Sequence, residues 1–309
     1  MQQARNNFKS LVLLCLFPCL VLILTMLACM LFVYFTPSGE ELTFNYVWEQ
    51  SLYMFISAAP FVLIGVLVWF LIAYFANTAI IQAATGSQPL ERKDNKRVYN
   101  LVENLCMSQG MPMPKVNVIE DNSLNAFASG ISKSTYTVSL SRGIINRLND
   151  DELEGVIAHE LMHIRNRDVR LLIVSIVFVG IFAMVAQMAF RAMLYSGGGR
   201  NRDGRTAAVM MLIAFLVAIL GYFFATLMRF AISRKREYMA DAGAAEMTRQ
   251  PQALASALRK ISHDPKIEAI TRSDVAQLFI EHPLKGKGFS SLFATHPPIK
   301  KRIAILEQV

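Results

Sequence analysis

Two histidines four residues apart, with a glutamate directly after the first, form the clearest chemical pattern in this 309-residue chain. They are His159, Glu160 and His163, within the stretch VIAHELMHIRNRD. On a helix, residues four apart share a face, so both imidazoles can bind one metal ion. Glu160 lies about 100° further round the helix, where it can reach a metal-bound water without being a ligand. With zinc, this arrangement suits hydrolysis of a carbonyl compound, with Glu160 as the general base.

The sequence on both sides of this pattern makes it less probable that the pattern arose by chance. With 5 histidines in the chain, random order would produce such a pattern in roughly three sequences per thousand. The acidic run from Asn149 to Glu152 precedes it, and predicts a helix start with Asn149 or Asp150 as the cap. An uncharged apolar run follows it from Leu171. The motif is therefore expected on a well-capped helix just before an apolar segment.

A catalytic zinc ion needs a third protein ligand and an open coordination position. No further histidine continues the motif, since the other three are His263, His282 and His296. Glu237 and Asp241, four apart in ISRKREYMADAGAA, are the best carboxylates. Glu237 can complete the metal site, and Asp241 can accept a hydrogen bond from a ligand imidazole. The alternative is a solvated helix whose two like charges repel each other.

Long apolar runs indicate a membrane protein, because 54% of the residues are hydrophobic and only 17% are charged. Four runs are long enough to cross a hydrocarbon core of about 30 Å as helices. They cover residues 11–35, 52–76, 171–190 and 207–227. The first is too long for a cleavable signal peptide, and no small-residue cleavage site follows it. We therefore expect a retained anchor.

Flanking charges predict the orientation. Arg5 and Lys9 precede the first run, four basic residues follow the second from Arg92 to Arg97, and the link between the two runs carries only acidic charges. The positive-inside rule places both basic flanks in the cytoplasm. The basic link from Arg200 to Arg205, between the third and fourth runs, disagrees with this orientation. Two interpretations stay open: these runs form a hairpin despite the charges, or they enter the bilayer only partly.

Other classes of protein are disfavoured. The net charge is +8, but the basic residues cluster beside apolar runs, as expected next to anionic lipid, and form no stripe for nucleic acid. Three of the four cysteines lie inside the first apolar run, so neither a disulfide framework nor a cysteine-rich metal site is indicated.

Four segments together resemble a known family. They are HELMH at 159–163, SRKREYMAD at 233–241, NAFASG at 125–130 and THPPIKKRI at 295–303. Their order and spacing resemble those of the HtpX-type membrane-integrated zinc metalloproteases, which are relatives of the CAAX prenyl endopeptidase. The resemblance covers nearly the whole chain.

The resemblance implies a role for each matching residue. The implied zinc ligands are His159, His163 and Glu237, with Glu160 as the base and Asp241 as a partner of a ligand. It also implies that Asn125 and Phe127 lie on an edge strand that binds substrate by strand addition. Two roles stay open for His296: it binds the oxyanion, or it packs against the prolines after it.

The expected fold class is an α+β membrane protein, with four apolar helices and a mostly helical, gluzincin-like zinc metalloprotease domain that contains a small β-sheet. Residues 1–76 form the first transmembrane hairpin, and residues 171–232 form an inserted apolar hairpin. Residues 77–170 and 233–309 form the protease domain. It begins with a polar linker, then a helix at 95–109 and strands near 115–121, 125–131 and 135–140.

The expected function is that of a membrane-bound zinc endopeptidase, with one Zn²⁺ per chain. The resemblance implies that it hydrolyses misfolded or damaged membrane proteins at the cytoplasmic face of a bacterial inner membrane. One alternative is a zinc protease that cuts within the bilayer, which the charges on both sides of the motif disfavour. Another is a non-proteolytic membrane scaffold with a structural zinc, which would leave Glu160 without a purpose. Nothing in the sequence predicts an oligomeric state or a nucleic-acid partner.

Overall fold

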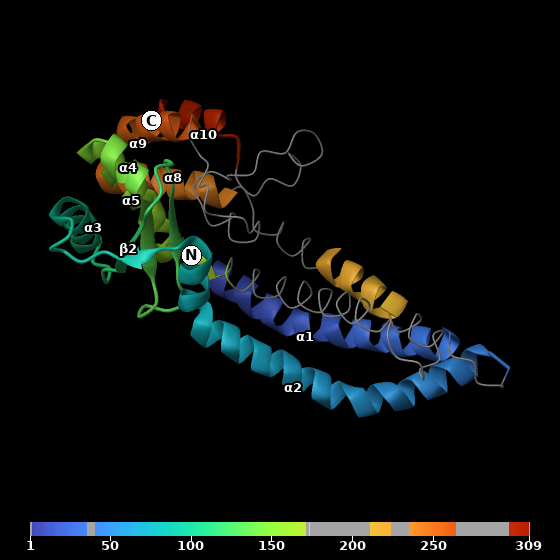
Figure 1. The fold of residues 1–309 in the computed structure, drawn as a ribbon. Helices are drawn as coiled ribbons and strands as arrows, with labels where there is room; N and C mark the ends of the chain where they lie inside the picture. The colour runs from blue at the N-terminus through green and yellow to red at the C-terminus, as the bar shows by residue number, and fades with distance from the viewer. Residues whose placement is uncertain are drawn as a thin grey trace. The chain divides into compact units, whose positions relative to one another are not determined.

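The computed structural model describes residues 2–35, 41–170, 173, 211–223, 235–263 and 297–308 (Figure 1). These residues are mostly helical, with one small mixed sheet. The chain divides into two compact units. The first unit comprises Met1–Ser10, Tyr74–Ile173 and Phe230–Val309, and the second comprises Leu11–Ala73 and Val174–Arg229.

Two long helices account for most of the described second unit. Helix α1 spans Gln2–Phe35 and helix α2 spans Phe44–Thr85. Their segments Leu14–Phe35 and Phe44–Ile72 are long and apolar enough to cross a membrane. Large apolar side chains on α2 stay open to the surroundings, as in Tyr53 and Phe61, which are both 76% exposed. Apolar surface of this extent is expected where lipid surrounds the protein.

The four predicted apolar helices are described to different degrees. The first two are helical over their whole predicted length, although α2 begins at Phe44, eight residues before the predicted start. The third predicted run, 171–190, lies outside the described residues except for Ile173. The fourth, 207–227, is described as the helix Met211–Phe223, which by itself is shorter than a bilayer is thick.

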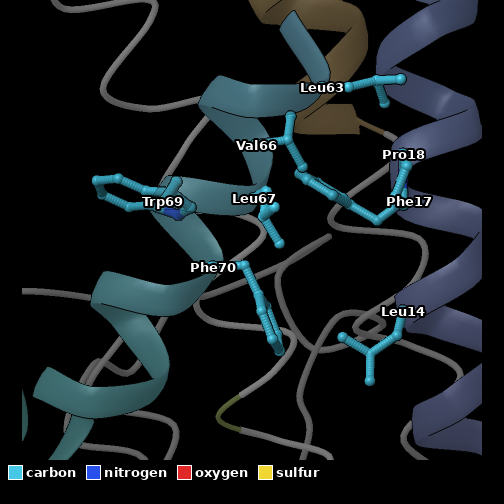
Figure 2. A pocket seen from close by; sticks show the side chains of 8 residues that line it. All are labelled: Leu14, Phe17, Pro18, Leu63, Val66, Leu67, Trp69 and Phe70. Carbon is cyan, nitrogen blue, oxygen red and sulfur yellow. The ribbon is translucent and has the colours of Figure 1, made fainter. Parts of the chain in front are cut away.

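An apolar cavity of about 430 Å³ lies between α1 and α2 within the second unit (Figure 2). Phe17 and Pro18 of α1 line one side of it, and Val66 and Phe70 of α2 line the other. Pro18 removes a backbone donor from the middle of α1, yet the helix continues through it. The cavity wall is almost entirely hydrocarbon.

The prediction of a polar linker directly after residue 76 is wrong for residues 77–85, because α2 continues to Thr85. The segment contains alanines, which favour a helix, and the Thr85 hydroxyl donates a hydrogen bond to the Ile81 carbonyl at 2.8 Å. Gly86 then takes a φ of +64°, a conformation that ends helices and suits glycine. The linker proper is therefore short.

The first unit contains a four-stranded sheet of order β1-β2-β4-β3. Its strands are β1 (Gln88–Pro89), β2 (Lys115–Ile119), β3 (Ala126–Ser129) and β4 (Thr137–Ser141). The β2–β4 pair is parallel, and the β1–β2 and β3–β4 pairs are antiparallel. Three of the strands lie at the predicted positions, but β1, only two residues long, was not predicted. Since β4 is interior, its side chains are all buried, and β3 forms one edge.

The first unit also contains further helices. They are α3 (Lys96–Ser108), α4 (Arg142–Arg147), α5 (Asp150–Arg165), α8 (Lys235–Thr248), α9 (Pro251–His263) and α10 (Ile299–Leu306). Helix α5 lies at the centre, in contact with β3, α8 and α9, and its core residues Leu153, Ile157 and Leu161 are fully buried. Burial of this helix on several sides holds its functional face in one position.

Candidate metal centre

Helix α5 carries the His-Glu-x-x-His pattern and begins as predicted. The Asn149 side chain accepts a hydrogen bond from the Glu152 backbone at 2.8 Å, and the Glu152 carboxylate accepts one from the Asn149 backbone at 3.0 Å. This is a complete capping box, which supplies partners for two backbone donors that a helix start leaves unpaired. His159 and Glu160 follow in the buried middle of the helix, 0% and 2% exposed.

The two histidines converge with Glu237, which lies in the first turn of α8. Nε2 of His159 and Nε2 of His163 are 3.2 Å apart. The Glu237 carboxylate lies 3.7 Å from the first of these nitrogens and 3.6 Å from the second. The contact between α5 and α8 therefore brings together residues that are far apart in the sequence.

These distances fit a zinc ion. Ligand atoms about 2.0–2.2 Å from a tetrahedral zinc lie roughly 3.3–3.6 Å from one another. The three separations in this cluster, from 3.2 to 3.7 Å, are close to that range. Two imidazoles and one carboxylate are also a donor set of catalytic zinc sites, which keep a fourth position open. The residues present thus fit the metal that the sequence suggested.

Asp241 lies one turn after Glu237 on α8 and pairs with the other side of the His159 ring. Its Oδ1 is 2.9 Å from His159 Nδ1. A hydrogen bond at Nδ1 leaves the Nε2 lone pair directed toward Glu237 and His163, which is the tautomer that a metal site needs.

Arg302 of α10 holds Asp241 in place, and the sequence reasoning did not single it out. Its Nε donates to Asp241 Oδ2 at 2.8 Å and its Nη2 donates to Oδ1 at 2.7 Å. Its Nη1 is also 3.7 Å from the Glu237 carboxylate. The Arg302 side chain is 1% exposed, so it is a buried cation that balances two buried carboxylates. Arg302 lies within the segment THPPIKKRI, but no spacing there indicated this role.

Asp168 gives His163 an equivalent partner, and it too had no assigned role in the sequence. Its Oδ2 is 3.2 Å from His163 Nδ1. Arg167 adopts a φ of +59° just after α5 ends, and this turn brings the chain back toward the histidine. Both histidines therefore have a carboxylate at Nδ1 and a shared space at Nε2.

The charges in this cluster shift the pKa values of its members. Burial and the charge of Arg302 lower the pKa of His159, but hydrogen bonds to Asp241 and Glu237 outweigh them and raise it to about 9. A metal ion that binds His159 at neutral pH therefore displaces a proton. Burial raises the pKa of Asp241, but Arg302 and His159 outweigh it and lower the pKa to about 2.

Glu160 has a different environment, although it is next to His159. Its burial is the largest influence and raises the pKa of its carboxyl group. The nearby charges of the two histidines oppose this shift, and that of Glu237 adds to it. A carboxylate with a raised pKa beside a metal-binding cluster suits a group that must accept and then release a proton.

The remaining predicted site residues lie at the sheet edge or outside the described chain. Phe127 is in the edge strand β3, and Asn125 comes directly before it. Both side chains are fully buried. The Asn125 backbone exchanges hydrogen bonds with Ser141, so it extends the pairing with β4. His296 lies outside the described residues.

Comparison with known proteins shows the family of the chain. Residues 92–309 match the sequence profile of Peptidase family M48. A Protease HtpX homolog of Bacteroides fragilis is 65% identical over 99% of this chain and 97% of its own length. A Protease HtpX homolog of Lactobacillus helveticus is 38% identical over 100% of this chain and 99% of its own length.

A solved structure is also similar. The crystal structure of S. mikatae Ste24p aligns with a TM-score of 0.47 and 20% sequence identity, over 79% of this chain and 57% of that chain.

The match to the family and the two long apolar helices together define the class: this is a membrane protease from a family of metalloproteases. More particularly, the chain belongs to Peptidase family M48, and its similarity to the HtpX-type proteases, expected from its motifs, is confirmed.

Proposed function

We propose that this protein is a zinc-dependent endopeptidase that cleaves misfolded or damaged membrane proteins at the cytoplasmic face of the membrane. His159, His163 and Glu237 are the proposed ligands of one zinc ion, and Glu160 is the proposed base. The observation that carries the proposal is the convergence of these three ligand groups at separations that suit zinc.

Each residue around the proposed zinc site has a separate role in hydrolysis. A bound zinc ion supplies a Lewis acid that makes water more acidic and polarises the scissile carbonyl group. Glu160 accepts the proton of the attacking water and later donates it to the leaving amine. Burial raises the pKa of Glu160, which makes its carboxylate a better proton acceptor. Asp241 and Asp168 hold the imidazole rings of the ligands.

Strand β3 is the proposed docking element for substrate. It is an edge of the described sheet and packs against α5, which carries the metal-binding residues. An extended peptide that pairs with such an edge is held by its backbone, which suits loose sequence preference. The side chains of Phe127 and Asn125 are buried. Their proposed role is therefore to hold β3 in position, and not to contact substrate with their side chains.

The proposed topology is multi-pass, with the first unit in the cytoplasm. The basic flanks of the first two apolar runs support it, since positive charge concentrates on the cytoplasmic side. Residues 1–76 and 171–232 are the proposed membrane hairpins. Substrates would then be cytoplasmic segments of other membrane proteins, and inner-membrane localisation is part of the same proposal.

The test uses full-length protein purified in detergent with zinc. The wild type is expected to cleave casein, an unfolded protein, and to lose this activity with a chelator. The Glu160→Gln variant is expected to keep its zinc but lose activity at least a hundredfold, because the general base contributes about that much or more. Activity equal to wild type in this variant would refute the mechanism.

Two further results separate the proposal from its alternatives. Glu237→Ala is expected to lose zinc as well as activity, and unchanged zinc content would refute its role as a ligand. Zinc binding by the wild type with no peptidase activity on casein or on a misfolded membrane protein would support a scaffold with a structural zinc. Cleavage sites confined to transmembrane segments of the substrate would support an intramembrane protease.

A further inference from the structure

The support of His163 extends beyond Asp168 to the first turns of the chain. Asn6 lies on α1, within Met1–Ser10, the part of that helix that belongs to the first unit. Its side-chain amide nitrogen donates to Asp168 Oδ1 at 2.6 Å and to the Asn166 backbone carbonyl at 2.8 Å. Asp168 uses its other oxygen, Oδ2, to reach His163 Nδ1. A continuous hydrogen-bonded path therefore runs from Asn6 to a candidate zinc ligand.

The chemistry at this contact specifies an amide. The two N–H groups of the Asn6 side chain match two acceptors, one a carboxylate and one a carbonyl, so the orientation of the amide is determined. Asn6 is 1% exposed and Asp168 is 2% exposed, so water has little access to either. An aspartate at position 6 would have the same shape but would offer only acceptors to a buried carboxylate.

The contact also fixes the segment that follows α5. Asn166 caps that helix and Asp168 comes two residues later, after the left-handed turn at Arg167. Asn6 bonds to both Asn166 and Asp168 and so bridges this turn. Arg236 adds a hydrogen bond from Nη1 to the Asp168 backbone carbonyl at 3.3 Å, while its distance to Asp168 Oδ1 is 4.0 Å. Asn6 therefore lies closer to Asp168 Oδ1 than Arg236 does.

We infer that Asn6 is a positioning residue for the metal site, acting through Asp168 to hold the His163 ring with Nε2 directed at the metal. The inference rests on the proposed zinc function. It means that the N-terminal turns of α1, which precede the apolar run, form part of the metal centre. Direct partners of metal-binding histidines, the position that Asp168 holds, change metal affinity or activity by about 10–100-fold. Asn6 acts through this partner.

Zinc affinity of full-length protein in detergent, measured by competition with a chromogenic chelator, tests this inference. Asn6→Ala is expected to raise the zinc Kd by about tenfold or more. Asn7→Ala is the matched control, because it removes the same side chain one position later in the helix. The Asn7 amide oxygen has no hydrogen-bond partner in the described part of the chain. An Asn6→Ala protein with wild-type Kd would overturn the inference.

A double-mutant cycle separates positioning from a general effect on folding. If Asn6 acts through Asp168, Asn6→Ala causes no further rise in Kd in an Asp168→Ala background. A full additional rise in that background would show that Asn6 acts by another route, and the inference would fail. Circular dichroism of the metal-free proteins reports whether each variant is folded.

An isosteric variant keeps the test independent of cavity formation. Asn6→Asp retains the shape of the side chain but replaces both donors, and is expected to weaken zinc binding at least as much as Asn6→Ala. A wild-type Kd in this variant would count against the inference. Failure of the proposed function would give a different result. In that case the wild type would bind no zinc, or the Glu237→Ala variant would bind zinc as tightly as the wild type.

Discussion

At the scale of single residues, the candidate metal centre consists of buried charges that hold one another. Asp241 reaches His159 and is held in turn by both arms of Arg302. A buried carboxylate is unfavourable unless it is paired, and the fork of an arginine pairs with both of its oxygens at once. Arg302 therefore has a stabilising role that does not depend on contact with substrate.

The Arg302→Ala variant is expected to lose about 3 kcal/mol of unfolding free energy, because it leaves Asp241 without its cation. Chemical denaturation of the metal-free protein measures this loss. Lys301→Ala is the control, since Lys301 is exposed on the same helix and its removal is expected to change little. Equal stability of the two variants would contradict the proposed role of Arg302.

At the scale of elements, α5 is held at its start as well as at its candidate metal-binding face. The Glu152 carboxylate accepts hydrogen bonds from the Ser256 hydroxyl and the Lys260 ammonium of α9, both at 2.7 Å. Burial raises the pKa of Glu152, but Lys260, Ser256 and the Asn149 backbone outweigh it, so the pKa is lowered. The first turn of α5 is thus fixed to α9 by a charged group.

This contact predicts a pH dependence of stability. Since the pKa of Glu152 is lower in the folded protein, its contribution is present above its unfolded pKa of about 4.3 and is lost as the pH falls through the folded value. Glu152→Gln is expected to destabilise the protein by about 2 kcal/mol at pH 7. The difference from wild type is expected to shrink in acid. Denaturation of both proteins from pH 7 to pH 3 checks it, with the exposed Glu246→Gln as control.

The junction between β4 and α4 depends on a glycine. A Cβ at Gly143 would overlap the backbone carbonyl of Asn122. A backbone carbonyl cannot move aside as the end of a flexible side chain can. Gly143→Ala is expected to cost about 3 kcal/mol, measured by denaturation. At Gly243 of α8 the neighbour is instead the flexible end of Met162, so Gly243→Ala is expected to cost less. A reversed order of the two variants would show that the α4 backbone is free to shift.

At the scale of the whole molecule, metal binding and the stability of the first unit are expected to be coupled, because the proposed ligands come from two helices, α5 and α8. Zinc at a hundred times its Kd stabilises a folded site by about 2.7 kcal/mol. Chelation is therefore expected to lower the thermal midpoint of the wild type. The Glu237→Ala variant is expected to show the same midpoint with and without chelator. A metal-dependent midpoint in that variant would point to other ligands.

The sequence predicted the local features of this molecule well. Apolar runs long enough for a bilayer appear as α1 and α2, and the alternation of apolar residues appears as β2, β3 and β4. The cap at Asn149 follows from the local pattern of residues. Glu237 was chosen as the third ligand because few donors were suitable, and it lies close to both histidines. The helices, strands and cap depend on residues that are neighbours in the chain. The metal ligands could be predicted because the sequence offers few histidines and carboxylates in suitable places.

The supporting contacts could not be predicted in the same way. Asn6 and Arg302 reach the site only through tertiary packing. Asp168 is close to His163 in the sequence, but their contact depends on the turn after α5, which helical spacing does not predict. The continuation of α2 past Ala76 was missed because polar residues there form local helical hydrogen bonds. The inserted hairpin expected at 171–232 remains a prediction.

The position of Arg302 in the sequence has a consequence for biosynthesis. The chain is made from its N-terminus, and the His159–Asp241 pair is complete long before the ribosome reaches α10. Until Arg302 is added, the buried Asp241 carboxylate lacks the cation that holds it. A nascent or prematurely terminated chain therefore has its histidines without their final support. The order of synthesis delays the complete set of contacts around the candidate metal centre until α10 has been translated.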